Sequence, residues 1–337
     1  MIHLVQVRRG DTRRLAAVFE PQLRLFRSPL DTTYALAQWL AHAGSPGVAQ
    51  LEAQLSDEWI EYDPVYRGES EWRLLGPIDH PTDPARCLVS GTGLTHYGSA
   101  RNRAAMHGAN AEELTDSMRM FRLGVERGRP APGSVGAAPE WFYKGPGQIL
   151  RDPGAPLDVP GYAEDGGEEA EVAGIYLIAD DGAPRRIGFT AGNEFSDHRF
   201  EKHNYLNLAG SKLRTCSLGP ELVLDARFQQ VNGRVQIERD GAVLWQKEVR
   251  TGESEMCHSL ANIEHHHFKF EAHRRPGDVH VHYFGAYALS FGEGVAVQDG
   301  DVMSVAFDGF GRPLRNPLRV QPALAGAIQV KALLDNA

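Results

Sequence analysis

Short apolar runs, broken by polar residues and turn residues, make up most of this chain. In the first eighty residues, apolar and polar positions alternate as in strands over 4–7, 15–19 and 23–26. A helical pattern then runs from Thr32 to Ala43 and ends at Gly44, with Asp31 or Thr32 as its N-cap. A second helical piece is predicted over 47–55. These elements predict a small α+β unit.

A proline-rich crossing separates residues 1–80 from a larger unit over residues 81–337, and we interpret the two as separate domains. The apolar runs of the larger unit are short, and the chain holds 36 glycines and 20 prolines. Asn232-Gly233 and Asp240-Gly241 are hairpin signals, and a helix is predicted over 258–274. The pattern is therefore typical of a mainly β fold with α+β elements.

One stretch brings carboxylates to the ends of two predicted strands. Side chains alternate between two faces in Gly167–Ala179, so Glu169 and Glu171 point the same way. The turn at 180–182 sends the chain back antiparallel and brings Glu194 near them. Three close carboxylates repel one another unless a cation lies between them, and oxygen ligands suit Mg²⁺ first, then Mn²⁺ or Ca²⁺. The alternative is a solvated acidic face, which we expect for Glu164, Asp165 and Glu168.

A glycine-rich segment upstream has the composition of a ligand-binding loop. Gly91, Gly93 and Gly98 allow the backbone to come close to a ligand. The substrate contacts expected on this loop are Tyr97, Ser99 and Arg101, together with Thr95 and His96. The guanidinium of Arg101 would hold a carboxylate through two hydrogen bonds. The alternative is a surface loop with a solvated arginine.

Histidines recur in two other segments. Three consecutive rings at 265–267 on a helix cannot all face one metal, so we interpret them as solvated or capping residues. In the strand-like segment 279–285, His280 and His282 share a face. They would form a metal site only with a third ligand, which the sequence pattern does not identify.

Net charge limits the classes of partner that are expected, and the cysteines indicate the cellular compartment. The formal net charge of −9 argues against nucleic acid or an anionic membrane surface as a partner. Apolar runs are far shorter than the roughly 18 residues of a membrane span. The three cysteines have no metal-binding spacing, which predicts reduced thiols in a cytoplasmic protein.

Motifs of the larger unit resemble, in order and spacing, those of the fumarylacetoacetate hydrolase family. They are Glu169-Ala-Glu-Val-Ala, Phe189-Thr-Ala-Gly-Asn-Glu194-Phe-Ser, Ser211-Lys212 and Ser217-Leu-Gly-Pro220. The chain is most similar to the 2-keto-3-deoxy sugar-acid dehydratase branch, through the segments 139–144, 205–208 and 216–220. The resemblance covers residues 87–318 and has one departure, because the family usually has aspartate where this chain has Glu194.

The resemblance implies an incomplete β-barrel, or β-roll, of coiled sheets around a divalent metal, with the small N-terminal unit in front. The family is usually dimeric, so a homodimer or dimer-based homo-oligomer is expected. The metal ligands implied are Glu169, Glu171 and Glu194, with Mg²⁺ as the expected ion.

The resemblance also implies roles for residues outside the acidic stretch. Glu140 and Lys212 are the implied acid–base pair, with the direction of proton transfer left open. Lys144 is the implied anion contact, and Ser290 lies near the family's C-terminal substrate loop. The small-molecule substrate would be a 2-keto acid.

The expected activity is Mg²⁺-dependent dehydration of a 2-keto-3-deoxy sugar acid, above all a pentonate, to a 2-oxo acid semialdehyde in sugar-acid catabolism. Family hydrolases usually activate water with a His-x-x-Glu pair, whereas His96 is followed three residues later by Ser99. His107, with Glu112 or Glu113, is a candidate replacement for that pair. The alternative is that these two acids lie in the first turn of an amphipathic helix and favour its dipole. Two alternatives stay open: a metal-dependent C–C hydrolase of an acylpyruvate or fumarylacetoacetate-like diketo acid, and a non-enzymatic accessory protein of a sugar operon.

Overall fold

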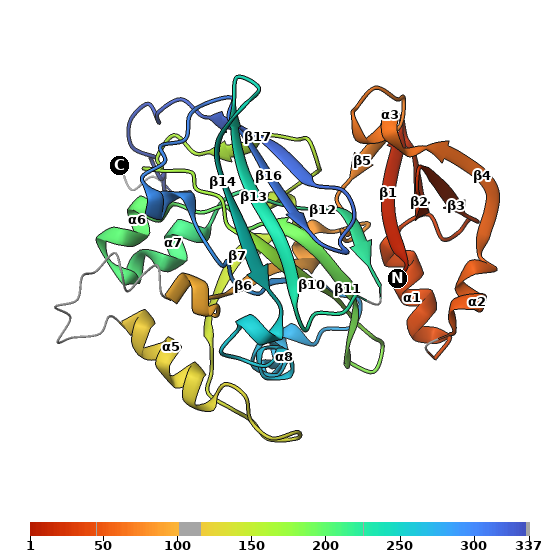
Figure 1. Cartoon of the computed structure of the whole chain (residues 1–337), viewed down its shortest axis with the longest axis horizontal. Coiled ribbons are helices and arrows are strands. Elements are labelled where there is room, and N and C mark those ends of the chain that lie inside the picture. Colours follow the sequence, from red (N-terminus) through yellow and green to blue (C-terminus); the bar gives the residue numbers. More distant parts are fainter. Residues whose placement is uncertain (45, 101–115, 225, 335–337) are drawn as a thin grey trace.

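Strand pairing forms two sheets in the computed structural model, which describes residues 1–334 except 45, 101–115 and 225 (Figure 1). In this part of the chain the larger sheet has the order β4-β3-β2-β1-β12-β11-β10-β15-β6-β7, with β5 beside β1 and β8 beside β12. Its strands are β1 (His3–Arg9), β2 (Thr12–Phe19), β3 (Gln22–Phe26), β4 (Leu55–Glu61), β5 (Arg73–Leu75), β6 (Cys87–Gly93), β7 (Glu140–Pro146), β8 (Leu150–Arg151), β10 (Ala170–Ile178), β11 (Pro184–Asn193), β12 (Cys216–Val223) and β15 (Val279–Tyr283).

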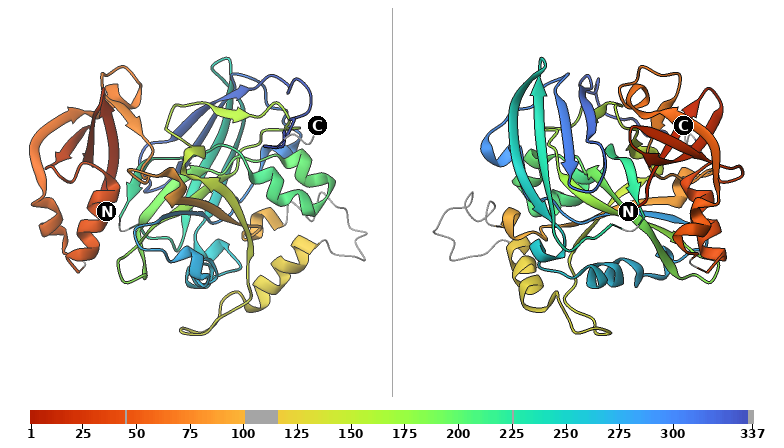
Figure 2. Two further views of the ribbon diagram at one scale, coloured as in Figure 1. Left: turned by 180° about the vertical axis from the view of Figure 1, so that it is seen from behind. Right: turned by 45° about the vertical axis from the view of Figure 1, so that its right-hand side comes forward.

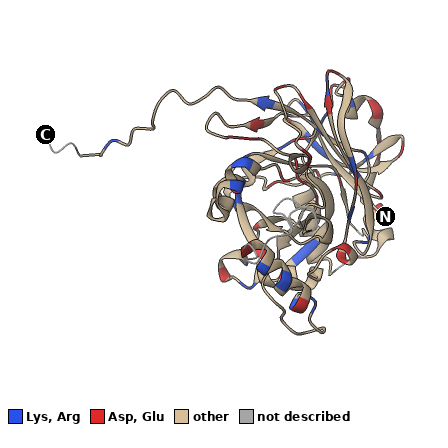
Figure 3. Cartoon of the chain, turned by 60° about the vertical axis from the view of Figure 1, so that its left-hand side comes forward, with Lys and Arg blue, Asp and Glu red and all other residues tan. Residues whose placement is uncertain are grey.

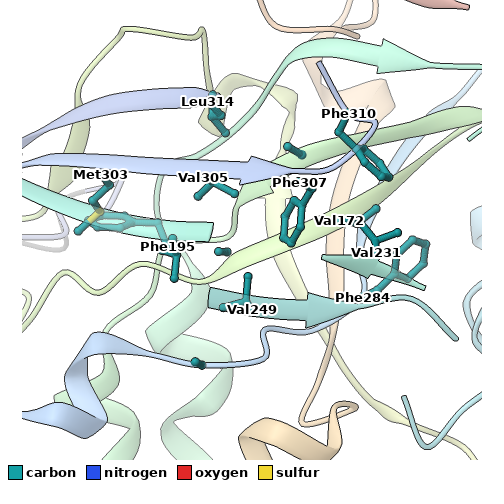
Figure 4. Packing of buried hydrophobic residues seen from close by; sticks show 14 of the residues in the cluster. Val172, Phe195, Val231, Val249, Phe284, Met303, Val305, Phe307, Phe310 and Leu314 are labelled. Atoms are coloured by element: carbon teal, nitrogen blue, oxygen red, sulfur yellow. The ribbon is translucent and has the colours of Figure 1, made fainter. Parts of the chain in front are cut away.

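The smaller sheet packs against the centre of the larger one. Its order is β14-β13-β16-β17-β9, and its strands are β9 (Leu157–Val159), β13 (Val231–Arg239), β14 (Ala242–Thr251), β16 (Val302–Phe307) and β17 (Leu314–Val320). Buried side chains of both sheets form one hydrophobic cluster, in which Val172 of the larger sheet joins Val305 and Phe307 of the smaller (Figure 4). This core holds β10 and β11, the strands that carry the acidic stretch.

Helices are short and lie outside the two sheets (Figure 1). The α-helices described are α1 (Thr33–His42), α2 (Val48–Glu52), α3 (Tyr62–Tyr66), α5 (Asp116–Arg127), α6 (His198–His203), α7 (Leu208–Lys212) and α8 (Leu260–Phe268). The 3₁₀ turns are η1 (Pro84–Arg86), η2 (Gly147–Ile149), η3 (Tyr205–Asn207), η4 (Glu253–Glu255), η5 (Glu271–His273) and η6 (Ser290–Glu293). The fold is mainly β, as the sequence pattern predicts.

The N-terminal unit is joined to the larger unit through the main sheet. β1 pairs with β2 on one side and with β12 on the other, so the first strands extend that sheet (Figures 1 and 2). Tyr62 donates its hydroxyl to Glu221 of β12 at 3.0 Å, and the Arg312 guanidinium lies 3.9 Å over the Tyr62 ring. The two units therefore share backbone pairing as well as side-chain contacts.

Most of the predicted local elements are present. The Thr32 side chain accepts a hydrogen bond from the Ala35 N–H and caps α1, and β10 turns back into β11 at 179–183. Asp240-Gly241 forms the β13–β14 turn, with φ values of 51° and 78°. The prediction of a turn at Asn232-Gly233 is wrong, because both residues lie inside β13. Gly233 is needed there for space, since a Cβ would lie 2.3 Å from the Phe307 ring.

Two of the three consecutive histidines are buried, which makes the solvated interpretation wrong for them. The predicted helix ends at Phe268, and η5 follows it. His265 is exposed, whereas His266 is 8% and His267 1% exposed. The reason is that His267 packs against the His280 ring of β15, at 5.0 Å between ring centroids.

The last described residues leave the body of the molecule. After β17 the chain runs outward without helix or strand to residue 334 (Figure 3). In the described residues, no helix is long and apolar enough to cross a membrane. All three cysteines are buried and free, as predicted.

Candidate metal and catalytic site

Three glutamates meet at the open end of the β10–β11 hairpin. Glu169 precedes β10, Glu171 is its second residue, and Glu194 directly follows β11. The Glu194 N–H donates to the Glu169 carbonyl at 2.9 Å, which continues the pairing to this end. One carboxylate oxygen of each glutamate lies within 4.8 Å of the other two. The structure thus brings together the three acids that strand alternation and the turn predict; we call them the glutamate cluster.

Two buried lysines approach the glutamate cluster. The Lys212 ammonium, at the end of α7, lies 2.5 Å from a Glu169 oxygen and 2.7 Å from Glu194 Oε2. Lys144 of β7 forms an ion pair with Glu194 Oε1 and donates to the carbonyls of Phe195 and Lys212 at 3.1 and 2.9 Å. Both oxygens of Glu194 therefore face an ammonium. The described contacts of Lys144 are thus internal to the protein.

The protonation of the glutamate cluster is uneven. Burial raises the pKa of Glu171 well above its usual range, and the charges of Glu169 and Glu194 raise it further. Burial also acts to raise the pKa of Glu169, but Lys212 and a hydrogen bond from His198 hold it well below its usual range. Burial acts to lower the pKa of Lys212, yet Glu169 and Glu194 raise it well above its usual range. Among the described residues Glu171 forms no ion pair, and the charge of Lys212 lowers its pKa less than burial and the two other glutamates raise it.

The oxygen atoms of Glu171 fit a cation. Oε2 accepts the Gly285 N–H at 2.6 Å, whereas Oε1 is buried and has no hydrogen-bond partner in the described part of the chain. A buried carboxylate oxygen without a partner costs free energy, and a divalent ion beside it would remove that cost. Because the donors are carboxylate oxygens only, the set suits Mg²⁺, Mn²⁺ or Ca²⁺.

Sequence reasoning missed two residues that hold the glutamate cluster in place. The His198 Nε2 lies 3.1 Å from a Glu169 oxygen, and Ser196 donates its hydroxyl to Glu194 at 2.8 Å. Burial acts to lower the pKa of His198, but the hydrogen bond to Glu169 raises it overall. Their place in the sequence could have indicated this role, since both residues lie within four positions of Glu194.

Glu168 is a buried anchor, and the prediction of a solvated side chain is wrong for it. It is 0% exposed, because Ser290 donates both its N–H and its hydroxyl to the carboxylate, at 2.7 and 2.6 Å. Burial raises the pKa of Glu168. In this structure the Ser290 hydroxyl binds the segment before β10.

One face of β7 lies along the cluster. Glu140, Phe142 and Lys144 are buried while Tyr143 between them is exposed, as alternation predicts. Phe142 places its ring 4.8 Å from the Lys212 ammonium. The Glu140 carboxylate accepts the Tyr205 hydroxyl at 3.3 Å and lies against Gly93, where a Cβ would be 1.9 Å from its oxygen. Glu140 and Phe142 thus share the buried face of β7, and Phe142 on that face contacts Lys212.

The glycine-rich loop is only partly described. Tyr97 and Ser99 are half-buried; the Tyr97 ring contacts Phe121, and the Ser99 hydroxyl donates to the His96 carbonyl at 3.0 Å. Arg101 lies outside the described residues, as do His107, Glu112 and Glu113. His96 is 0% exposed, with its nitrogens bonded to the hydroxyls of Thr95 and Thr251 at 2.9 and 2.8 Å. Burial lowers the pKa of His96 to about 3.

Comparison with known proteins identifies the family of this chain. Residues 103–319 match the model of the fumarylacetoacetate hydrolase C-terminal domain. The chain belongs to the fumarylacetoacetate hydrolase family. No curated protein matches the chain significantly.

Solved structures of fumarylacetoacetate hydrolase folds superpose on almost the whole chain. A 2-keto-3-deoxy-D-arabinonate dehydratase complexed with magnesium and 2,5-dioxopentanoate is 16% identical, with a TM-score of 0.70 and coverage of 95% of this chain and 99% of that one. A 2-hydroxyhepta-2,4-diene-1,7-dioate isomerase from Mycobacterium marinum is 17% identical, with a TM-score of 0.58 and the same coverage. A 5-carboxymethyl-2-hydroxymuconate delta-isomerase from Mycobacterium smegmatis is 19% identical, with a TM-score of 0.57 and again the same coverage. These similarities establish the fold.

Replacement of Ser290 by alanine is expected to loosen the C-terminal loop of this family member. The change leaves one buried Glu168 oxygen without its donor, which costs about 1–3 kcal/mol of unfolding free energy. Urea denaturation of the metal-free protein measures this loss. The double change Glu168→Gln with Ser290→Ala, which removes the buried acid as well, should recover part of it; an unchanged midpoint for Ser290→Ala alone would contradict the anchoring role.

Proposed function

We propose that this protein is a Mg²⁺-dependent dehydratase of a 2-keto-3-deoxy sugar acid, a pentonate above all, which yields a 2-oxo acid semialdehyde. The observation that carries the proposal is a buried cluster of three glutamates, of which Glu171 forms no ion pair among the described residues, with a protonated Lys212 beside the cluster. The greater structural similarity to the dehydratase than to the isomerases supports this choice.

Glu169, Glu171 and Glu194 would hold the Mg²⁺. When bound, the ion supplies Lewis-acid polarisation of the substrate's keto group, which makes the C3 protons more acidic. Glu194 is one methylene longer than the usual aspartate, and the ammonium groups of Lys144 and Lys212 fix its two oxygens. The longer arm is thereby held in one place.

Two residues are assigned to proton transfer. Lys212 is protonated in the metal-free protein, because Glu169 and Glu194 raise its pKa. With Mg²⁺ bound, those two charges would be offset and Lys212 would be a stronger acid, so we assign it to protonate the leaving C4 hydroxyl. Glu140, on the β7 face that also presents Phe142 to Lys212, is assigned to remove the C3 proton. The C3–H and C4–O bonds break, a C3=C4 bond forms, and one water leaves. A proton shift from C5 to C3 then moves the double bond to C4=C5, and this enol becomes the C5 aldehyde without further change in composition. Tyr97, Ser99 and Arg101 remain proposed contacts of the substrate's distal part.

Hydrolysis is the less favoured alternative because His96, which stands where family hydrolases have their water-activating histidine, has both ring nitrogens engaged in hydrogen bonds. Both nitrogens of His96 are bonded to threonine hydroxyls, and its pKa of about 3 keeps it from accepting a proton near neutral pH. A C–C hydrolase would need such a base to activate water for attack on a ketone.

Product analysis tests the proposed function. Mg²⁺-loaded protein is incubated with a panel of 2-keto-3-deoxy pentonates and hexonates and with acylpyruvates, and the products are separated by mass. We expect one product lighter than its substrate by one water from a 2-keto-3-deoxy acid, and no conversion of acylpyruvates. Two shorter acids would indicate hydrolysis, and a product of unchanged mass would indicate isomerisation; either result would replace dehydration as the activity.

A further inference from the structure

A histidine cluster lies where α8, η5 and β15 meet, apart from the glutamate cluster. One ring nitrogen each of His267, His273 and His280 lies within 4.8 Å of the other two. His267 and His280 are 1% and 0% exposed, whereas His273 is half-buried and opens the cluster toward solvent. The sequence pattern paired His280 with His282 and identified no third residue, whereas the structure groups His280 with His267 and His273.

The hydrogen bonds of the cluster leave nitrogens available for a metal. The His273 Nδ1 lies 2.7 Å from the His267 carbonyl, so it carries the proton and Nε2 keeps a free lone pair. A backbone carbonyl on the other ring nitrogen is the usual arrangement of a metal-bound histidine. The His267 Nε2 and the His280 Nδ1 face each other at 2.9 Å, so these are the ligand atoms that the two rings offer. The other His280 nitrogen, Nε2, is buried without a close hydrogen-bond partner among the described residues and interacts with the His273 backbone, so it can carry the ring proton when Nδ1 binds a metal.

The two buried rings, His267 and His280, are uncharged, which is the state that binds metals. Burial lowers the pKa of His280 to about 3. Burial, together with the neighbouring histidines, lowers the pKa of His267 well below its usual range. His282 also packs against His267, but its two nitrogens bond the Ser90 and Thr92 hydroxyls at 2.8 and 2.6 Å, and it is not part of the group whose nitrogens lie within 4.8 Å of one another.

We propose that His267, His273 and His280 bind one Zn²⁺ or a similar nitrogen-preferring divalent ion, at a site independent of the glutamate cluster. Tetrahedral Zn²⁺ with bonds of about 2.0–2.1 Å holds its ligand nitrogens about 3.3 Å apart, so the 2.9 Å gap between His267 and His280 needs to open only slightly. Solvent at the half-buried His273 supplies the fourth ligand. The ion would tie α8 and η5 to β15, the strand that pairs with β10.

Trp141 competes with the ion for His267. Its ring N–H donates to the His267 Nδ1 at 3.2 Å, which places the His267 proton on Nε2, between two prospective ligand atoms. Metal binding moves that proton to Nδ1, where it opposes the Trp141 N–H. Loss of this one hydrogen bond makes Trp141→Phe bind the ion about threefold to tenfold more tightly.

Cobalt absorption tests the proposal without relying on activity. Co²⁺ is titrated into metal-free Glu171→Gln protein, in which the glutamate cluster lacks one ligand. Four-coordinate Co²⁺ on imidazoles absorbs visible light far more strongly than six-coordinate Co²⁺ on oxygens. We expect a strong visible band that saturates at one ion per chain and that Zn²⁺ displaces. His280→Ala should remove the band, His273→Gln should weaken binding at least tenfold, and His265→Ala, an exposed neighbour on α8, should leave it unchanged.

Each outcome tests the histidine site separately from the glutamate cluster. Absence of the band in protein with all three histidines would overturn the proposal, whatever the fate of the variants. A band that survives His273→Gln with unchanged affinity, or an affinity that Trp141→Phe does not raise, would also contradict it. Because these measurements do not involve substrate, failure of the dehydratase assignment would leave them unaffected.

Discussion

Glu171→Gln is expected to reduce turnover by a factor of about a hundred or more and to remove the stabilisation by Mg²⁺. The amide keeps the shape of the side chain, but it lacks the charge that a divalent ion needs. In the unsubstituted protein, Mg²⁺ at a hundred times its dissociation constant should add about 2.7 kcal/mol to the unfolding free energy. Thermal unfolding with and without Mg²⁺ measures this stabilisation in the unsubstituted protein and its loss in Glu171→Gln.

The same variant has the opposite effect on the metal-free protein. The raised pKa of Glu171 means that the folded state holds this proton more tightly than the unfolded state. Stability therefore falls as pH rises from the unfolded pKa through the raised folded pKa, and the glutamine variant lacks that loss. Without metal near neutral pH, Glu171→Gln should melt at a higher temperature. Glu164→Gln, which changes a partly exposed acid paired with His203, is the control; equal Mg²⁺ stabilisation of Glu171→Gln and the unsubstituted protein would refute the ligand assignment.

Lys212→Met is expected to reduce turnover by a factor of about a hundred or more at every Mg²⁺ concentration. Methionine has a similar volume but cannot transfer a proton. If Lys212 only balanced the charges of Glu169 and Glu194, its loss would alter metal affinity and saturating Mg²⁺ would restore turnover. Steady-state rates over a Mg²⁺ series separate the two roles.

The matched control for this lysine is Lys202→Met. Lys202 is exposed on α6, ten residues before Lys212, and should be replaceable without loss of rate. Recovery of full turnover by Lys212→Met in excess Mg²⁺ would contradict the proton-transfer role. Metal-free Lys212→Met should also be less stable, because Glu169 and Glu194 lose a shared buried ammonium.

The sequence predicted the glutamate cluster because strand geometry is local. Alternation placed Glu169 and Glu171 together, and the turn at 180–182 returned the chain to Glu194. The same reasoning misjudged Asn232-Gly233, because the need for space at Gly233 arises from Phe307, a residue more than seventy positions away. Local patterns cannot report such a contact.

The sequence also failed to predict which polar residues are buried. Glu168 follows two glycines and precedes an acidic pair, so it looked solvated, yet Ser290 from the C-terminal loop covers it. His267 is buried because β15, which pairs with β6 and β10, lies against α8. Lys144 was expected to contact the anionic substrate, and in the structure it forms an ion pair with Glu194. In each case the partner comes from a distant segment.

The most direct measurement of the central claim is a turnover experiment in ¹⁸O-labelled water with Mg²⁺ and a 2-keto-3-deoxy pentonate. β-Elimination takes no oxygen from solvent, so we predict one product that has lost a single water and that gains label only by carbonyl exchange. Glu171→Gln and Lys212→Met should form no such product above background. A labelled oxygen in a newly formed carboxylate, with two shorter acids in place of one lighter keto acid, would contradict the account.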